Sequence, residues 1–222
     1  MQGGAMQPDS EEVRALAAAC GRELDQEQAG RLASYLGLLA SWNRRMNLVG
    51  PADWREVLRT LIPDGWVLAD FLEREAPEAG LTLDLGAGAG LPGIPLRMFY
   101  HSGRHILVEP RQKRTIFLTY VLGALELPGV AVRRCRAEDL PDDLRRADVV
   151  LSKAFMPWRE YLEVARPLLA EDGLCLVLSS EKPPEEPPGG WRAGRSVEYE
   201  VAGRYRSVWS FTPAICSRKD PL

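Results

Sequence analysis

The chain is poor in the residues that build disulfide frameworks and metal centres. Its 222 residues include two histidines and four cysteines, and no two cysteines have the C-x-x-C spacing. Scattered thiols of this kind favour neither a zinc site nor a set of disulfide bonds. We therefore expect no bound metal and reduced thiols. The cysteines are Cys20, Cys135, Cys175 and Cys216.

Long hydrophobic runs are also missing. No apolar segment approaches the roughly 18 residues that a membrane-crossing helix needs. The stretch Met1–Glu12 is acidic, whereas a secretory signal begins with basic residues followed by apolar ones. Hydrophobic residues still make up 45% of the chain, which is enough for one sizeable core with a small helical attachment. These features predict a cytoplasmic protein that does not enter membranes.

Neither sign of charge dominates the chain. The formal net charge is −3, which argues against a surface coated with basic residues for nucleic acid. The average hides a local excess, because seven lysines and arginines but only two acidic residues lie between His101 and Arg136. Such a patch can bind phosphates, although a solvated surface is the common explanation for a cluster of charges.

Helical periodicity dominates the first 78 residues. Asp9 and Glu12 have the spacing of a capping box, and apolar residues then recur at intervals of three and four. We assign residues 9–78 to an N-terminal helical region. Its helices are expected to begin near Asp9 and Asp25 and to cover residues 53–61 and 65–75, with Pro63 as a break.

The period changes at residue 81, where apolar strands begin to alternate with helices. This order is typical of a parallel α/β sheet, and we assign residues 79–216 to it. Residues 182–190 are too rich in proline for regular structure. The expected strands cover 81–85, 105–109, 130–133, 148–152 and 174–180, followed by an antiparallel pair over 197–202 and 206–212. The expected helices cover 94–100, 112–125 and 158–169, the last ended by Glu171-Asp-Gly173.

A glycine-crowded turn follows the first expected strand. Gly88, Gly90 and Gly93 satisfy the dinucleotide fingerprint G-x-G-x-x-G, and Glu109 ends the next strand about twenty residues later. A carboxylate at that place can accept hydrogen bonds from the hydroxyl groups of an adenosine ribose. Because NAD and S-adenosylmethionine both contain that ribose, the pattern alone leaves both cofactors open.

Two features favour S-adenosylmethionine. Pro92 and Pro95 remove backbone N–H groups where a pyrophosphate needs donors, and S-adenosylmethionine has no phosphates. The sheet is also expected to end in a hairpin rather than in a second mononucleotide-binding half. This topology is similar to the methyltransferase variant of the doubly wound fold.

Three motifs, in order, resemble one family. They are W-N-R-R-M-N-L at 42–48, D-L-G-A-G-A-G-L-P-G-I-P-L at 84–96 and V-E-P-R-Q-K-R-T-I-F-L at 108–118, with further matches at 136–138, 150–155 and 167–169. Together they resemble the RsmG (GidB) family of small-subunit rRNA guanine-N7 methyltransferases. The resemblance extends over about residues 26–212.

The resemblance implies an α/β fold of class I S-adenosylmethionine-dependent methyltransferases. This is a Rossmann-like, mostly parallel sheet with an antiparallel C-terminal strand pair, here with an N-terminal helical extension. The implied reaction is methyl transfer to guanine N7 of 16S rRNA, either free or in the small ribosomal subunit. That reaction removes no proton, so alignment of the reactants can supply most of the acceleration. The chain also lacks the Asn-Pro-Pro-Tyr and Pro-Cys sequences of methyltransferases that act on other base atoms.

The resemblance also implies the site residues. Lys153 is expected to face both cofactor and substrate and to position the reactants, and no metal is implied. Lys113 and Arg114 are expected to contact the phosphates of the substrate. The implied cofactor-binding residues are Gly86, Gly88, Gly90 and Leu91 around the methionine and ribose, Glu109 on the ribose hydroxyls, Ala137 and Glu138 beside the adenine, and Lys153.

Aromatic and amide side chains in the motifs have weaker assignments. Phe155 and Trp158 follow the fourth strand and are candidates for stacking on the target base. Trp42 lies among leucines and is expected to pack in the core. Asn43 and Asn47 receive no role from the sequence.

The chain departs from the family pattern on the substrate side. Lys153 stands where the family has arginine, Thr60 where it usually has histidine, and Leu178-Ser-Ser180 where it has Leu-Lys-Gly. A lysine cannot make the two parallel hydrogen bonds of an arginine. A second hypothesis is therefore a diverged module that binds S-adenosylmethionine and contacts RNA with weak, altered or no activity. A third, NAD-dependent oxidoreductase, depends only on the three fingerprint glycines.

Overall fold

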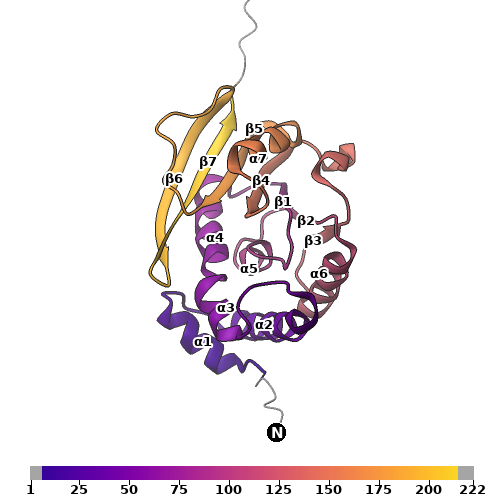
Figure 1. Ribbon diagram of the computed structural model, residues 1–222, viewed down its shortest axis with the longest axis vertical. Coiled ribbons are helices and arrows are strands. Elements are labelled where there is room, and N and C mark those ends of the chain that lie inside the picture. Colours follow the sequence, from indigo (N-terminus) through magenta and orange to yellow (C-terminus); the bar gives the residue numbers. More distant parts are fainter. Residues whose placement is uncertain (1–6, 215–222) are drawn as a thin grey trace, which may run out of the picture.

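Seven strands form one sheet in the computed structural model, which describes residues 7–214 (Figure 1). The strands are β1 (Leu81–Leu85), β2 (Arg104–Val108), β3 (Val130–Arg133), β4 (Ala147–Lys153), β5 (Leu169–Ser179), β6 (Trp191–Val201) and β7 (Arg204–Pro213). Their order across the sheet is β3-β2-β1-β4-β5-β7-β6. Neighbours from β3 to β5 pair in parallel, whereas β7 runs antiparallel to both β5 and β6. The predicted mostly parallel sheet with an antiparallel C-terminal strand pair is thereby confirmed.

Seven α-helices accompany the strands over the described residues, and none of them is long and apolar enough to cross a bilayer. They are α1 (Ser10–Ala19), α2 (Gln26–Met46), α3 (Trp54–Thr60), α4 (Pro63–Glu75), α5 (Gly93–Arg97), α6 (Gln112–Leu125) and α7 (Trp158–Ala165). Aspartates cap the first three, because the side chains of Asp9, Asp25 and Asp53 accept hydrogen bonds from free N–H groups of the first turn. Only half of the predicted capping box forms at Asp9, since the carboxylate of Glu12 accepts from Arg55. Pro63 does not break a helix but opens α4, where its missing N–H costs nothing.

Helices cover both faces of the sheet. On one face, α4 and α5 pack on apolar side chains of β4, β5 and β7, including Val149, Leu176 and Val208. On the other face, α7 packs on Val150, Val177 and other residues of the central strands. The helices α1, α2 and α3 lie at one end of the molecule, where α2 packs against α6 (Figure 1). The helical region is thus attached beside the glycine turn.

The strand β5 corrects one prediction. Glu171-Asp-Gly173 does not end a helix, because α7 ends at Ala165 and a 3-10 turn leads directly into β5 at Leu169. The pairing of β4 with β5 shifts between Ala147, opposite Leu169, and Val149, opposite Leu174, so the acidic residues form a bulge inside the strand. A Cβ at Gly173 would lie 2.7 Å from the carbonyl oxygen of Ala147, which explains the glycine. The closing hairpin is also longer than predicted, since β6 begins at Trp191.

The helix α2 offers a first prediction about stability. A Cβ at Gly30 would meet no atom within 4 Å, so Gly30→Ala should raise the free energy of unfolding by about 0.5–1 kcal/mol through the lower flexibility of the unfolded chain. Gly65 of α4 is the matched control, because a Cβ there would lie 2.6 Å from Cβ of Pro95. Urea unfolding measures both changes. An unchanged or lower midpoint for Gly30→Ala, or a higher one for Gly65→Ala, contradicts this account.

Candidate functional site

The chain turns sharply after β1, at the carboxyl edge of the parallel strands. Gly86, Gly88 and Gly90 have φ angles of +72°, +58° and +83°, which side chains with a Cβ rarely adopt. The N–H of Gly86 donates to the carbonyl of Val108 at 2.9 Å, which joins the turn to the end of β2. From α2, the hydroxyl of Tyr35 donates to the carbonyl of Ala89 at 2.9 Å. The turn is therefore held in place from the sheet and from the helical region.

Glu109, directly after β2, faces this turn. Its carboxylate accepts the N–H of Gly88 at 3.0 Å and the N–H of Arg111 at 2.9 Å, and the guanidinium of Arg114 lies 3.8 Å away. A carboxylate has about four acceptor positions, so these two amides leave room for hydroxyl donors. A Cβ at Gly88 would lie 3.5 Å from the guanidinium of Arg114, so this arginine lies beside the glycine as well as beside Glu109. The structure thus brings together three of the residues that the sequence singled out.

The remaining predicted residues lie along the same edge. Because β3, β2, β1 and β4 are adjacent and parallel, the segments that follow them border one another. Ala137 is buried in the core that contains Leu85 and Val108, and its neighbour Glu138 is exposed. Leu91 is half-buried and Lys113 is exposed. Their roles toward a cofactor or substrate stay predictions.

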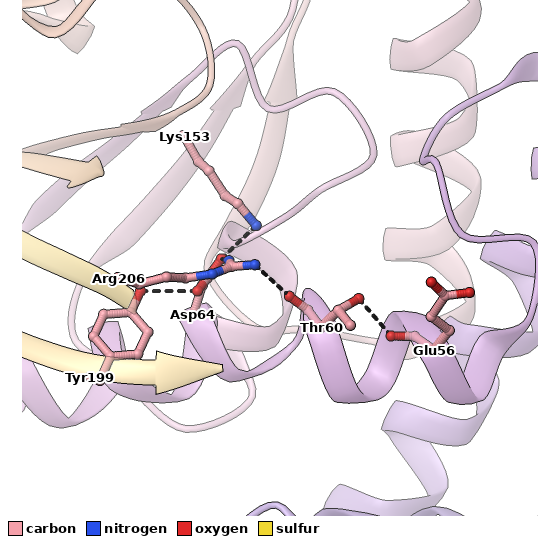
Figure 2. A network of polar contacts seen from close by, with 6 residues as sticks. All are labelled: Glu56, Thr60, Asp64, Lys153, Tyr199 and Arg206. Carbon is pink, nitrogen blue, oxygen red and sulfur yellow. Dashed lines mark hydrogen bonds and ion pairs between the residues drawn. The ribbon is translucent and has the colours of Figure 1, made fainter. Parts of the chain in front are cut away.

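Lys153, at the end of β4, belongs to a polar network that the sequence did not reveal (Figure 2). Its Nζ lies 2.5 Å from Oδ2 of Asp64, an oxygen that also accepts from Arg206. The hydroxyl of Tyr199 donates to Oδ1 of Asp64 at 2.9 Å, and Arg206 donates to the carbonyl of Thr60 at 2.9 Å. The Asp64 side chain is 1% exposed, so one buried carboxylate joins α4, β4, β6 and β7.

This network lies beside a cavity of about 720 Å³, which is large enough for a nucleotide. The cavity is bounded by the segment between β4 and α7, the end of β5 and the β6–β7 hairpin. Lys153, Ser179 and Ser180 line it, so two of the three departures from the family pattern lie on its wall. The third, Thr60, donates its hydroxyl to the carbonyl of Glu56 within α3.

The two aromatic residues after β4 differ in their surroundings. A Cβ at Gly86 would lie 2.6 Å from the ring of Phe155, so this ring covers the start of the glycine turn. Trp158 packs edge-on against Trp209 with ring centroids 5.5 Å apart, and the guanidinium of Arg159 lies 4.2 Å from its ring centre. These contacts favour packing for Trp158. Base stacking by Phe155 stays a prediction.

The family described as GidB, rRNA small subunit methyltransferase G, matches residues 28–190. The chain belongs to this family. It is 39% identical to the ribosomal RNA small subunit methyltransferase G of Oleidesulfovibrio alaskensis over 221 residues, which are 95% of each chain. It is 43% identical to the protein of that name from Nitratidesulfovibrio vulgaris over 185 residues, or 83% of this chain and 85% of the relative.

Solved structures share the fold at low identity. The O-methyltransferase TomG from Streptomyces achromogenes, in complex with SAM, has a TM-score of 0.59 at 15% identity and covers 93% of this chain and 99% of its own. A SAM-dependent methyltransferase from Aquifex aeolicus has a TM-score of 0.53 at 19% identity and covers 78% of this chain and 98% of its own. The resemblance predicted from the motifs is confirmed, and membership in a methyltransferase family argues against the oxidoreductase hypothesis.

The first motif of the family resemblance has a structural explanation. The amide of Asn43 donates to the carbonyls of Val49 and Pro51 at 3.0 and 3.1 Å and accepts the N–H of Val49 at 2.9 Å. Asn47 ends α2 with a φ of +48°, a conformation that asparagine tolerates. Both asparagines therefore shape the turn after α2. Trp42 is half-buried and packs against α6 at the edge of the core, so its predicted place in the core is confirmed only in part.

Two buried titratable residues lie beneath the glycine turn. A Cβ at Gly93 would lie 2.3 Å from Oδ2 of Asp84 and 2.9 Å from Nε2 of His105, so both flank this glycine. Within the described residues, neither of those atoms has a hydrogen-bond partner. Burial raises the pKa of Asp84 to about 7 and lowers the pKa of His105 to about 3. Both side chains are thus expected to be neutral near pH 6.

The raised pKa of Asp84 predicts a pH effect on stability. Between pH 4 and 7 the folded protein holds a proton that the unfolded chain, with a pKa of 3.8, has released. The contribution of this proton to stability is complete below pH 4 and is lost as the pH rises toward 7. The stability of wild type relative to Asp84→Asn should therefore fall by roughly 1 kcal/mol per pH unit in this window. Urea unfolding at pH 5 and pH 7 measures it, and a constant difference contradicts the raised pKa.

Proposed function

We propose that the protein transfers the methyl group of S-adenosylmethionine to N7 of a guanine in 16S rRNA. The observation that carries the proposal is membership in the rRNA small subunit methyltransferase G family over residues 28–190. The glycine turn also supports it. Pro92 and Pro95 have no backbone N–H to donate, as expected beside a cofactor without phosphates. We place the protein in the cytoplasm, where it meets the small ribosomal subunit or its RNA.

The residues at the turn fit this cofactor. We propose that Gly86, Gly88, Gly90 and Leu91 form the wall beside its methionine and ribose, because the carboxylate of Glu109 faces this turn and accepts a hydrogen bond from the N–H of Gly88. The free acceptor positions of Glu109 suit the two ribose hydroxyls. Ala137 and Glu138, which follow β3 at the same edge, are proposed to flank the adenine. We also propose residues 79–216 as the methyltransferase domain and 9–78 as its helical extension; residues 215 and 216, Cys216 included, lie outside the described part.

The proposed reaction needs few catalytic groups from the protein. When bound, the cofactor supplies a methyl group that is already activated by the sulfonium. The N7 lone pair of guanine carries no proton, so the chain needs no general base and acts by alignment. Lys153 is proposed to contact the reactants from the wall of the cavity, and its ion pair with Asp64 holds its position there. Lys113 and Arg114 are proposed to contact substrate phosphates near the cofactor.

The experiment uses methyl-labelled cofactor and small ribosomal subunits from cells that lack this modification. Label on guanine N7 of 16S rRNA supports the proposal, and label on another atom contradicts the assigned position. Calorimetry with S-adenosylhomocysteine runs in parallel. Tight binding without any transfer would instead support the diverged, inactive module suggested by Lys153, Thr60 and Ser179.

A further inference from the structure

The exposed side of α6 has an unusual composition. From Thr115 to Leu125 the helix contains no charged residue, although α6 lies at the surface. Ile116 and Tyr120 are 51% and 56% exposed, and they are the large hydrophobic residues that are exposed in the described part of the chain. A surface helix ordinarily carries charged side chains toward water. This side of α6 therefore has the character of a contact surface.

The end of α2 continues this surface. Trp42 is half-buried and lies against Tyr120, with ring centroids 5.7 Å apart at an angle of 43°, and also against Phe117 at 5.6 Å. Tyr120 is thus supported by one aromatic neighbour while more than half of it stays open to water. A hollow of about 680 Å³ lies beside Trp42 and is lined by Arg44, Arg45 and other residues at the end of α2.

Basic residues lie near each member of the aromatic pair, because Arg44 and Arg45 line the hollow beside Trp42 and Lys113 precedes Tyr120 by two turns of α6. Arg44, Arg45 and Lys113 are exposed, and within residues 7–214 none of them forms an ion pair. Free cations next to an open aromatic ring match a nucleic-acid strand, whose phosphates are anionic and whose bases stack on aromatic side chains. An apolar protein partner would leave these three cations without partners, and a second copy packed through the same surface would bring like charges together.

The surface leads to the proposed methyl-transfer site. Lys113, Ile116 and Tyr120 stand at positions i, i+3 and i+7 of α6, so they follow one side of the helix. The helix begins three residues after Glu109, and Arg114 in its first turn lies 3.8 Å from that carboxylate. A strand lying along this side of α6 would therefore reach the edge where the cofactor is proposed to bind.

We propose that Trp42, Arg44, Arg45, Lys113, Ile116 and Tyr120 form a docking surface for a single-stranded segment of the RNA substrate beside its target guanine. One base stacks on Tyr120, while Arg44, Arg45 and Lys113 contact phosphates. The inference rests on the proposed function for the identity of the RNA. It adds a second RNA-binding surface, which lies outside the cavity lined by Lys153.

Binding of unmodified 16S rRNA fragments by fluorescence anisotropy tests the surface. Tyr120→Ala should weaken binding roughly 5- to 150-fold, the range for loss of one stacked base. Each of Arg44→Ala, Arg45→Ala and Lys113→Ala should reduce the slope of log affinity against log salt by roughly 0.7. Arg192→Ala is the control, because Arg192 is an exposed arginine on β6, the edge strand at the opposite end of the sheet from β3. It should change neither the RNA affinity nor the salt slope. Thermal unfolding checks that every variant is folded.

Turnover separates this inference from the proposed function. With S-adenosylmethionine saturating, Tyr120→Ala should raise the KM for RNA and leave kcat and the affinity for S-adenosylhomocysteine unchanged. Unchanged RNA affinity in Tyr120→Ala overturns the inference even if wild type methylates guanine N7. Self-association of wild type that is abolished by Tyr120→Ala, measured by sedimentation, also overturns it. Wild type that binds RNA through Tyr120 without methyl transfer contradicts the proposed function alone.

Discussion

Asp64→Ala is expected to lower the free energy of unfolding by about 3 kcal/mol. The carboxylate is 1% exposed, while the side chains of Lys153 and Arg206 are 20% and 19% exposed. Removing it leaves two largely buried cations beside each other without their shared anion, and the hydroxyl of Tyr199 loses its acceptor. The loss of stability is large because the charges of Lys153 and Arg206 stay shielded from water and no longer face an anion. Urea unfolding at pH 7 measures the change.

An exposed ion pair provides the control for Asp64. Arg22 and Asp70 lie 2.7 Å apart, yet the Asp70 side chain is 53% exposed. Asp70→Ala should therefore cost less than about 1 kcal/mol. Each substitution removes an aspartate of α4 that pairs with an arginine. The difference between the two losses of stability therefore measures the effect of burying the ion pair. Equal losses for Asp64→Ala and Asp70→Ala would show that the buried network adds no particular stability.

The difference between these two aspartates was not visible in the sequence. Asp64 is separated from Tyr199 by 135 residues and from Arg206 by 142, so their meeting depends on how β6 and β7 return to α4. The one local signal is an acidic residue within the apolar run Leu61–Trp66, a place where an unpaired carboxylate would be costly. Sequence patterns show local periodicity and the order of motifs. Neither of these predicts contacts between residues more than 100 positions apart.

Where local signals were strong, the sequence was sufficient. The change of period at residue 81, where apolar strands begin to alternate with helices, predicted β1, β3 and α6 with the bounds that the structure has. The strand β5 was mispredicted because Glu171-Asp-Gly173 has turn composition, whereas pairing with β4 absorbs these residues as a bulge. At the site, motif order placed Gly88, Glu109 and Arg114 together correctly. The open side of Tyr120 could not be predicted, because it depends on which neighbours cover α6.

Gly88→Leu is expected to weaken binding of S-adenosylhomocysteine by roughly 100-fold, since the added side chain enters the space proposed for the cofactor. A Cβ at Gly88 meets no atom closer than 3.5 Å, so the first atom of the new side chain does not clash with the protein. The φ of +58° still adds a cost to folding of about 1–2 kcal/mol for any residue with a Cβ. Thermal unfolding with and without ligand measures binding, because a ligand at 100 times its Kd stabilises the wild type by about 2.7 kcal/mol.

Gly203→Leu is the matched control for backbone strain. Gly203 joins β6 to β7 with a φ of +74°, and a Cβ there would meet nothing within 4 Å. This variant therefore carries a similar conformational cost, but it lies in a different turn from the one proposed to bind the cofactor. It should lose comparable stability and keep the full stabilisation by S-adenosylhomocysteine. If Gly88→Leu keeps that stabilisation as well, the cofactor does not lie against the turn after β1, and the proposed binding site is wrong.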